Sequence, residues 1–224
     1  MTRCFLSFRH VLLVATAFAG SLSVVAAVPP GPAVTSPPPA LDDDPAARYL
    51  PLPISQTTVN APQRERLRAI ERGLRHRPEH SGLLAARGFI RAQRGDVAAA
   101  EGDYRRALEV VGDDALAKRH VLWSLGWARF EARDDEGALG AWREAAALHG
   151  GRPYWWPYSA ALAEWRLGRR DAALTLFDAA VAGMPEWGTE TGLTRRTRAW
   201  PAHQVEIAQA IFTAWQASKR ATQP

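Results

Sequence analysis

The chain has very little cysteine and lysine. Among its 224 residues there is one cysteine, Cys4, and the only lysines are Lys118 and Lys219. Cys4 lies before an apolar run near the N-terminus, so a chain that loses this segment has no disulfide and no thiolate site. The fold must then be held together by packing alone. The formal net charge of +5 therefore reflects abundant arginine, and it falls by two if Arg3 and Arg9 are removed.

The sequence also lacks the motifs that carry most enzyme chemistry. His76 and His80 are four residues apart, but Pro78 between them breaks the helix that would align them as metal ligands. There is no Gly-x-Ser-x-Gly turn, no glycine-rich phosphate loop and no convincing carboxylate pair. Glu131 and Glu164 are expected to be solvated or paired with arginine. We therefore predict a protein that is not an enzyme and that has no metal and no cofactor; a small hydrolase is the alternative.

The N-terminus has the pattern of an export signal. Arg3, Arg9 and His10 precede an uncharged apolar run over residues 11–28. Small residues at its end favour cleavage after residue 27, which predicts a signal peptide over 1–27 and a periplasmic or otherwise exported protein. A retained N-terminal membrane anchor is the competing interpretation. Residues 28–62 are rich in proline without periodicity, which predicts a flexible linker.

A triplet of alanine, aromatic and alanine returns three times in one register. The triplets are Ala100/Tyr104/Ala107, Ala138/Trp142/Ala145 and Ala173/Phe177/Ala180. The triplets are spaced 38 and then 35 residues apart. A repeat of this length indicates a stack of similar units, in which each unit buries its apolar face against its neighbours. Small residues let two helix axes approach, and the aromatic side chain fills the space to the next unit. Coincidental alanines in an ordinary helical domain are the alternative.

The extended register resembles the tetratricopeptide repeat, a helix–turn–helix unit of about 34 residues. The residues that carry the resemblance are the small, turn and capping positions around each triplet: Gly88 and Gly95-Asp96; Leu125-Gly126 and Arg133-Asp134; Ala161 and Gly168. The spacing from the first unit to the second is longer than the usual period, and no unit has every consensus residue. The resemblance implies an all-α fold, a short right-handed solenoid with a C-terminal capping helix.

The register also predicts the boundaries of the units. We expect a degenerate half-repeat over 63–80, followed within 81–185 by three repeats at approximately 81–114, 119–152 and 154–187. A loop over 186–200 and a capping helix over 201–219 follow them. The cap is predicted because Val205, Ile211 and Phe212 belong to an amphipathic pattern that would cover the last apolar face.

The resemblance implies that the first helix of each unit lines a concave groove. The groove positions are mostly aromatic: Phe89, Trp123, Trp127, Phe130, Trp155, Tyr158, Trp165 and Arg166. Trp123, Trp127 and Phe130 follow one helix face at i, i+4 and i+7. Family members that grip a terminal carboxylate use lysine and asparagine in this groove, so that activity is not carried over. Aromatic side chains favour an apolar or aromatic-anchored peptide or helix instead.

These observations predict an exported adaptor or scaffold that binds a protein or peptide partner, in the bacterial envelope. A module that binds polysaccharide is the alternative, because aromatic side chains also stack on sugar rings. A third interpretation is that the 187–200 segment or the capping helix fills the groove, which makes the aromatic residues part of the core. Export argues against nucleic acid as a partner. Arginines gather over 64–77 and 195–198; these are either solvated faces or a surface for peripheral contact with anionic lipid or polysaccharide.

Overall fold

A computed structural model of the chain describes residues 62–151 and 153–221. Every regular element in these two ranges is helical, and neither range contains a strand. In chain order the elements are α2 (Gln63–His76), α3 (Ser81–Gln93), α4 (Val97–Val111), α5 (Ala115–Glu131), α6 (Asp135–His149), α7 (Trp155–Arg166), α8 (Arg170–Gly183), η2 (Pro185–Gly188), α9 (Glu190–Thr197) and α10 (Ala202–Ala221). The predicted signal peptide (1–27) and the predicted linker (28–62), apart from Pro62, lie outside the described residues.

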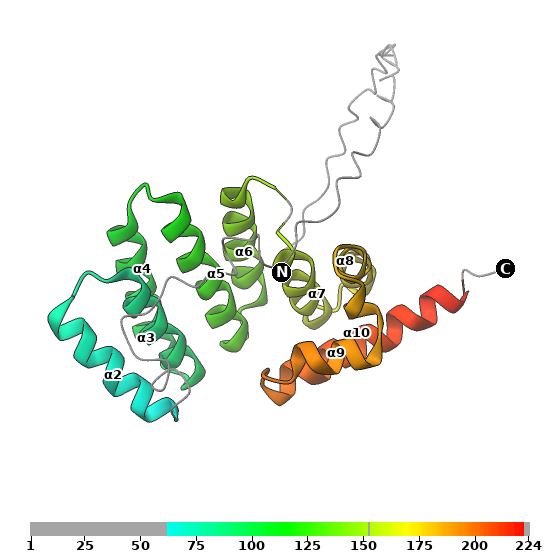
Figure 1. Ribbon diagram of the computed structural model, residues 1–224, viewed down its shortest axis with the longest axis horizontal. Coiled ribbons are helices and arrows are strands. Elements are labelled where there is room, and N and C mark those ends of the chain that lie inside the picture. Colours follow the sequence, from blue (N-terminus) through cyan, green and yellow to red (C-terminus); the bar gives the residue numbers. More distant parts are fainter. Residues whose placement is uncertain (1–61, 152, 222–224) are drawn as a thin grey trace, which may run out of the picture. The chain divides into compact units, whose positions relative to one another are not determined.

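Helices that follow one another in the sequence pack against one another. The most extensive contacts join α3 to α4, α5 to α6 and α7 to α8, and further contacts join α3 to α5 and α6 to α7 (Figure 1). The three pairs coincide with the predicted units 81–114, 119–152 and 154–187, apart from shifts of a few residues at their ends. The all-α class is thus confirmed, and the stepwise packing is compatible with a helical-repeat solenoid.

The repeated triplets form the core of the paired helices. All of their side chains are buried: Ala100, Tyr104, Ala107, Ala138, Trp142, Ala145, Ala173, Phe177 and Ala180. The polar groups of Tyr104 and Trp142 form hydrogen bonds with backbone carbonyl oxygens of α5. The Tyr104 hydroxyl donates to the carbonyl oxygen of Ser124 at 3.1 Å, and Trp142 Nε1 donates to the carbonyl oxygen of Trp123 at 3.1 Å. Large aromatic side chains are therefore buried here without leaving these polar groups unpaired.

Aspartate side chains begin the helices. Asp96 and Asp134 each accept a hydrogen bond from the backbone N–H three residues later, at the starts of α4 and α6. Asp114 does the same for α5, accepting from Ala117 N at 3.0 Å. Such caps satisfy amide groups that have no partner inside the helix. Because Asp114 caps α5, this helix begins at Ala115, earlier than the predicted unit boundary at residue 119.

The turn inside each helix pair needs a left-handed residue at one register position. Gly95 and Gly168 occupy it with φ of 81° and 78°, and Arg133 occupies it in the middle pair with φ of 67°. Glycine reaches this region without a steric penalty, whereas a residue with a Cβ atom is strained there. The middle pair therefore makes the same turn as its neighbours at a greater conformational cost.

The predicted loop over 186–200 is wrong: this segment contains the end of the 3-10 turn η2 and the helix α9. The Thr189 side chain caps α9 by accepting from Gly192 N at 3.1 Å, and Thr197 Oγ1 donates to the carbonyl oxygen of Leu193 at 2.9 Å. Trp187 and Leu193 are buried. The segment is helical because a cap and buried side chains stabilise it, although its own sequence has no helical periodicity.

The terminal helix α10 packs on α7 and α8. The Phe212 ring lies 6.5 Å from the Phe177 ring, and Trp215 Nε1 donates to Asp178 Oδ1 at 2.9 Å. Phe177 is the aromatic member of the third triplet, so α10 covers the last repeat, where the sequence predicts a cap at 201–219. None of the described helices combines the length and the apolar character that crossing a membrane requires.

Candidate functional site

The eight residues predicted to line a groove differ widely in exposure. Trp127, Phe130 and Trp155 are buried, with exposed fractions of 9%, 0% and 1%. The side chain of Arg166 is 8% exposed. The other four are half-buried and pack against the core: Phe89, Trp123, Tyr158 and Trp165. Half of the predicted residues are therefore enclosed by the protein itself.

Four of the eight lie together in an aromatic cluster. We define the cluster as eight rings joined by centroid distances of 5.0–6.3 Å: Trp123, Trp127, Phe130, Trp142, Tyr154, Tyr158, Trp187 and Trp200. Trp127 is at its centre, because its ring lies 5.0 Å from Trp142 and 5.9 Å from Trp200. The ring contacts of Trp127 are edge-to-face, a favourable geometry for aromatic pairs, and the other contacts of the cluster are tilted.

Trp200 joins the two halves of the cluster. Its ring lies 5.9 Å from Trp127 of α5 and 5.8 Å from Tyr158 of α7. Trp187 of η2 lies 5.0 Å from Tyr158. The segment over 187–200, called the C-terminal segment below, thus supplies two aromatic side chains, Trp187 and Trp200, to the face that the sequence assigns to a groove. The ring contacts therefore show that the 187–200 segment packs on this face, as the third interpretation of the sequence expects.

Three of the remaining predicted residues, Phe89, Trp155 and Trp165, do not belong to the cluster. Trp155 is buried, and its indole Nε1 has no hydrogen-bond partner among the described residues. The guanidinium of Arg170 lies 3.7 Å above the centre of the Trp165 ring and covers one face of it. Phe89 packs against the core of the first pair. The structure therefore does not unite Phe89, Trp155 and Trp165 with the aromatic cluster.

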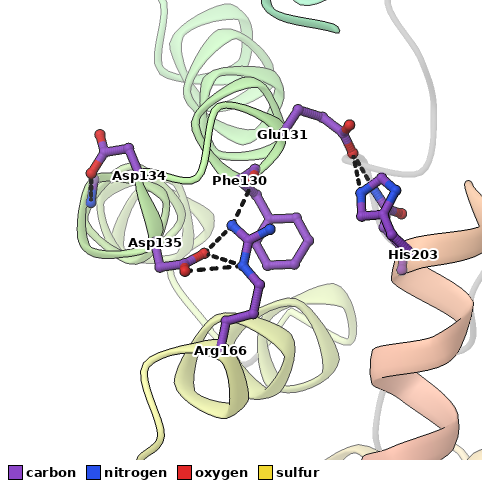
Figure 2. Close-up of polar contacts among 8 residues, drawn as sticks. Phe130, Glu131, Asp134, Asp135, Arg166 and His203 are labelled. Atoms are coloured by element: carbon purple, nitrogen blue, oxygen red, sulfur yellow. Dashed lines mark hydrogen bonds and ion pairs between the residues drawn. The ribbon is translucent and has the colours of Figure 1, made fainter.

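Arg166 is held in place by its own fold. Its guanidinium forms an ion pair with Asp135, where Nε lies 2.8 Å from Oδ1, and Nη2 donates to the carbonyl oxygen of Phe130 at 2.6 Å (Figure 2). The same group lies 3.7 Å above the Phe130 ring, in cation–π geometry. Arg166 thus ties α7 to α5 and α6 through Nε and Nη2, whereas its buried Nη1 has no hydrogen-bond partner among the described residues.

A polar contact joins α5 to α10 beside the cluster. Glu131 Oε1 lies 3.2 Å from His203 Nε2 and accepts a hydrogen bond of 2.5 Å from Gln204 Nε2 (Figure 2). The Glu131 side chain is only 11% exposed. Glu131 directly follows Phe130 in the sequence, and His203 and Gln204 come three and four residues after Trp200. The contact therefore holds the segment that carries Trp200 close to α5. Sequence periodicity could not identify it, because the two sides are more than seventy residues apart.

Ion pairs outside the cluster connect neighbouring helix pairs. The hydrogen bond from Arg129 to Glu101 is the main cause that raises the pKa of Arg129 above its ordinary value. The pKa of Arg169 is raised chiefly by its hydrogen bond to Glu136. Both arginines keep their charge at any physiological pH, and their contacts lie between neighbouring helix pairs.

The described residues offer aromatic surface more readily than reactive groups. Within 62–151 and 153–221, no three His, Cys, Asp or Glu side chains gather as metal ligands would. Comparison of the chain with protein-family models, with curated proteins and with solved structures finds no match. The aromatic cluster is the candidate site, because it gathers polarisable rings from α5, α6, α7 and the C-terminal segment.

Proposed function

We propose that the chain is a non-enzymatic, exported adaptor of tetratricopeptide type that binds a protein or peptide partner in the bacterial envelope. The contact surface is the half-buried edge of the aromatic cluster. One observation carries the proposal: the half-buried rings of Trp123, Tyr158 and Trp200 are joined through the buried ring of Trp127. Half-buried aromatic rings that pack on a buried ring are typical of binding hot spots.

The chemistry of the expected partner follows from these side chains. Indole and phenol rings held by their neighbours provide contact area at a small entropic cost, because they are already fixed before binding. A helix or extended peptide with apolar or aromatic anchors suits this surface. The buried residues of the predicted groove, Phe130 and Trp155, act in this proposal as supports rather than as contacts, and Arg166 holds α7 in place.

A polysaccharide partner is the weaker candidate. Stacking on a sugar ring needs an open aromatic face, and one face of Trp165 is covered by Arg170 at 3.7 Å. The ring contacts of Trp127 are mainly edge-to-face, with interplanar angles from 62° to 84°, so neighbouring rings close off its surface. Protein is therefore the partner that the geometry favours.

The test compares two double variants of the full chain. Trp123→Ala with Tyr158→Ala removes two half-buried rings of the cluster. Trp156→Ala with Trp215→Ala removes two half-buried rings that do not belong to it. Each protein is cross-linked to partners in membranes of the cell that encodes it, and the captured proteins are identified by mass spectrometry. We expect the wild type and the second variant to capture the same protein and the first variant to lose it.

Circular dichroism and thermal melting establish that both variants are folded. Capture that is equal for both variants would contradict the cluster as the contact surface. A saturable change in tryptophan fluorescence on adding envelope polysaccharide, with no protein captured, would favour the glycan alternative. Turnover in a broad hydrolase screen would overturn the non-enzymatic part of the proposal.

A further inference from the structure

Four arginines form a stripe along the outer face of α2. Arg64, Arg68, Arg72 and Arg75 are all exposed. At 3.6 residues per turn they fall within an arc of about 80° around the helix axis, with neighbours roughly one turn apart. We call this set the arginine stripe. It places four positive charges on one side of the helix over three turns, with Glu71 and Glu65 about 20° beyond its two edges.

No described residue neutralises the charges of the stripe. None of its four side chains has an ion pair or a hydrogen bond with another described residue. The two acids of α2, Glu65 and Glu71, form no ion pair with another residue in the described ranges either. Elsewhere, many arginines are paired with carboxylates: Arg87, Arg91, Arg106, Arg129, Arg166, Arg169, Arg195 and Arg196.

The opposite face of α2 fixes the direction of the stripe. Ile70 and Leu74 are buried, and the backbone at Gly73 packs so closely on Leu83 that a Cβ atom there would lie 2.8 Å from it. Gln63 Nε2 also donates to Gln93 Oε1 of α3 at 2.9 Å. α2 therefore lies against α3 by its apolar side (Figure 1). The helix cannot turn its arginines inward without losing this packing.

We propose that the arginine stripe binds an anionic lipid surface through the phosphates of the headgroups. The planar guanidinium group donates in pairs to phosphate oxygens, which suits arginine better than lysine to this task. Positive charges that lie on one side of a helix can contact the phosphates of a flat membrane surface at the same time. The sequence also has the apolar run over 11–28 ahead of α2, a segment that the sequence assigns to a signal peptide or a membrane anchor.

Single-stranded nucleic acid fits these residues less well. Proteins that bind single-stranded nucleic acid combine basic groups with aromatic side chains on which the bases stack. α2 has the sequence QRERLRAIERGLRH and contains no aromatic residue. The stripe is also separate from the aromatic cluster, which involves α5, α6, α7 and the C-terminal segment. This inference therefore stands or falls independently of the proposed adaptor function.

The direct test measures how fast individual arginines react with phenylglyoxal in the full chain. The protein is mixed either with vesicles of equal parts phosphatidylcholine and phosphatidylglycerol or with vesicles of phosphatidylcholine alone. Four exposed arginines that pair with no carboxylate of the described part of the chain serve as internal references: Arg105, Arg143, Arg198 and Arg220. We expect the anionic vesicles to slow modification of the stripe severalfold and to leave the references unchanged. Added salt should weaken the protection.

A matched pair of variants gives a second measurement. Substituting all four stripe arginines by glutamine should lower the partition coefficient onto anionic vesicles by roughly fivefold for each arginine. Substituting the four reference arginines removes the same total charge and should have little effect. The contribution of the 11–28 run is common to both variants and cancels in their ratio.

Three results would overturn the inference. Equal protection of stripe and reference arginines would show that only general proximity to the vesicle matters. Equal protection by neutral vesicles would exclude the lipid phosphate charge as the cause. Protection by heparin or DNA without protection by anionic vesicles would assign the stripe to a different polyanion.

Discussion

Trp142 lies so close to Gly126 that a Cβ atom on residue 126 would stand 2.1 Å from the indole Nε1. The first pair shows the same relationship, since a Cβ atom on Gly88 would lie 2.9 Å from Tyr104 Cε2. In both pairs the glycine lets the aromatic ring of the second helix approach the backbone of the first. This close crossing explains why an aromatic residue recurs at a fixed position in the triplets of these two pairs.

The first prediction concerns this crossing. Gly126→Ala should lower the free energy of unfolding by about 1–3 kcal/mol, because the buried Trp142 ring has no room to shift. Gly140→Ala is the matched control: residue 140 is exposed in α6 and has no atom within 4 Å of a new Cβ. The control should gain about 0.5–1 kcal/mol from helix propensity. Denaturant titrations measure both, and a loss of the same size in both variants would contradict the crossing.

A second prediction concerns the strained turn at Arg133. Because φ is 67° there, Arg133→Gly should raise the free energy of unfolding by about 0.5–1 kcal/mol, the relief of left-handed strain less the greater entropy of glycine in the unfolded chain. Arg143→Gly, in the interior of α6, should instead cost about 1 kcal/mol. Opposite signs in the two thermal melts support the turn geometry; a loss in both would refute it.

Much of the fold could be predicted because local and neighbouring contacts determine it. The triplets around Tyr104 and Trp142 require burial at a fixed spacing, and that spacing locates both helices of each pair. Asp96 and Asp134 mark helix starts through hydrogen bonds to their own chain. By contrast, α9 depends on Trp187 and Leu193 being buried by other elements, which no local pattern reveals.

The candidate site was less accessible to sequence reasoning. The i, i+4, i+7 pattern of Trp123, Trp127 and Phe130 places them on one face but does not say what covers that face. Trp200, which contacts Trp127, lies more than seventy residues away in the sequence. The sequence predicts that Arg166 lines the groove, and only the fold shows its pairing with Asp135. Long-range partners therefore decide which aromatic residues are exposed.

A third prediction concerns a buried carboxylate. Asp103 is 4% exposed and accepts hydrogen bonds from Arg87 at 2.6 and 2.9 Å and from Arg91 at 2.8 Å. Asp103→Asn should lower the free energy of unfolding by about 2–3 kcal/mol, because it removes charge-assisted bonds between α3 and α4. The two arginines retain some solvent contact, which keeps the loss below that of a fully buried pair.

The control for Asp103 is an exposed ion pair. Glu79 lies 2.6 Å from Arg106, and both side chains are about half exposed or more. Glu79→Gln should change the free energy of unfolding by only about 0.2–1 kcal/mol. If urea titrations show equal losses for Asp103→Asn and Glu79→Gln, burial does not strengthen the Asp103 contacts, and the prediction is wrong.

A fourth prediction concerns the pH dependence of the contact between α8 and α10. The ammonium of Lys219 lies 2.6 Å from Asp178 Oδ1, and this hydrogen bond, followed by the one from Trp215 Nε1, lowers the pKa of Asp178 below its ordinary value. A carboxylate with a lowered folded-state pKa stabilises the fold above its unfolded pKa of about 3.9, and the contribution is lost as pH falls through the lower, folded value. The contact should therefore be insensitive to pH near neutrality and weaken only in acid.

Carbon-detected NMR titration of the Asp178 carboxyl group tests this directly. Lys219→Ala should move the pKa of Asp178 upward, because the leading cause of the shift is removed, and Trp215→Phe should move it in the same direction through loss of the indole donor. Arg220→Ala is the control, since Arg220 is a neighbouring cation without an ion pair to Asp178. A pKa of Asp178 that is the same in the wild type and in Lys219→Ala would show that α10 is not held to α8 by this ion pair.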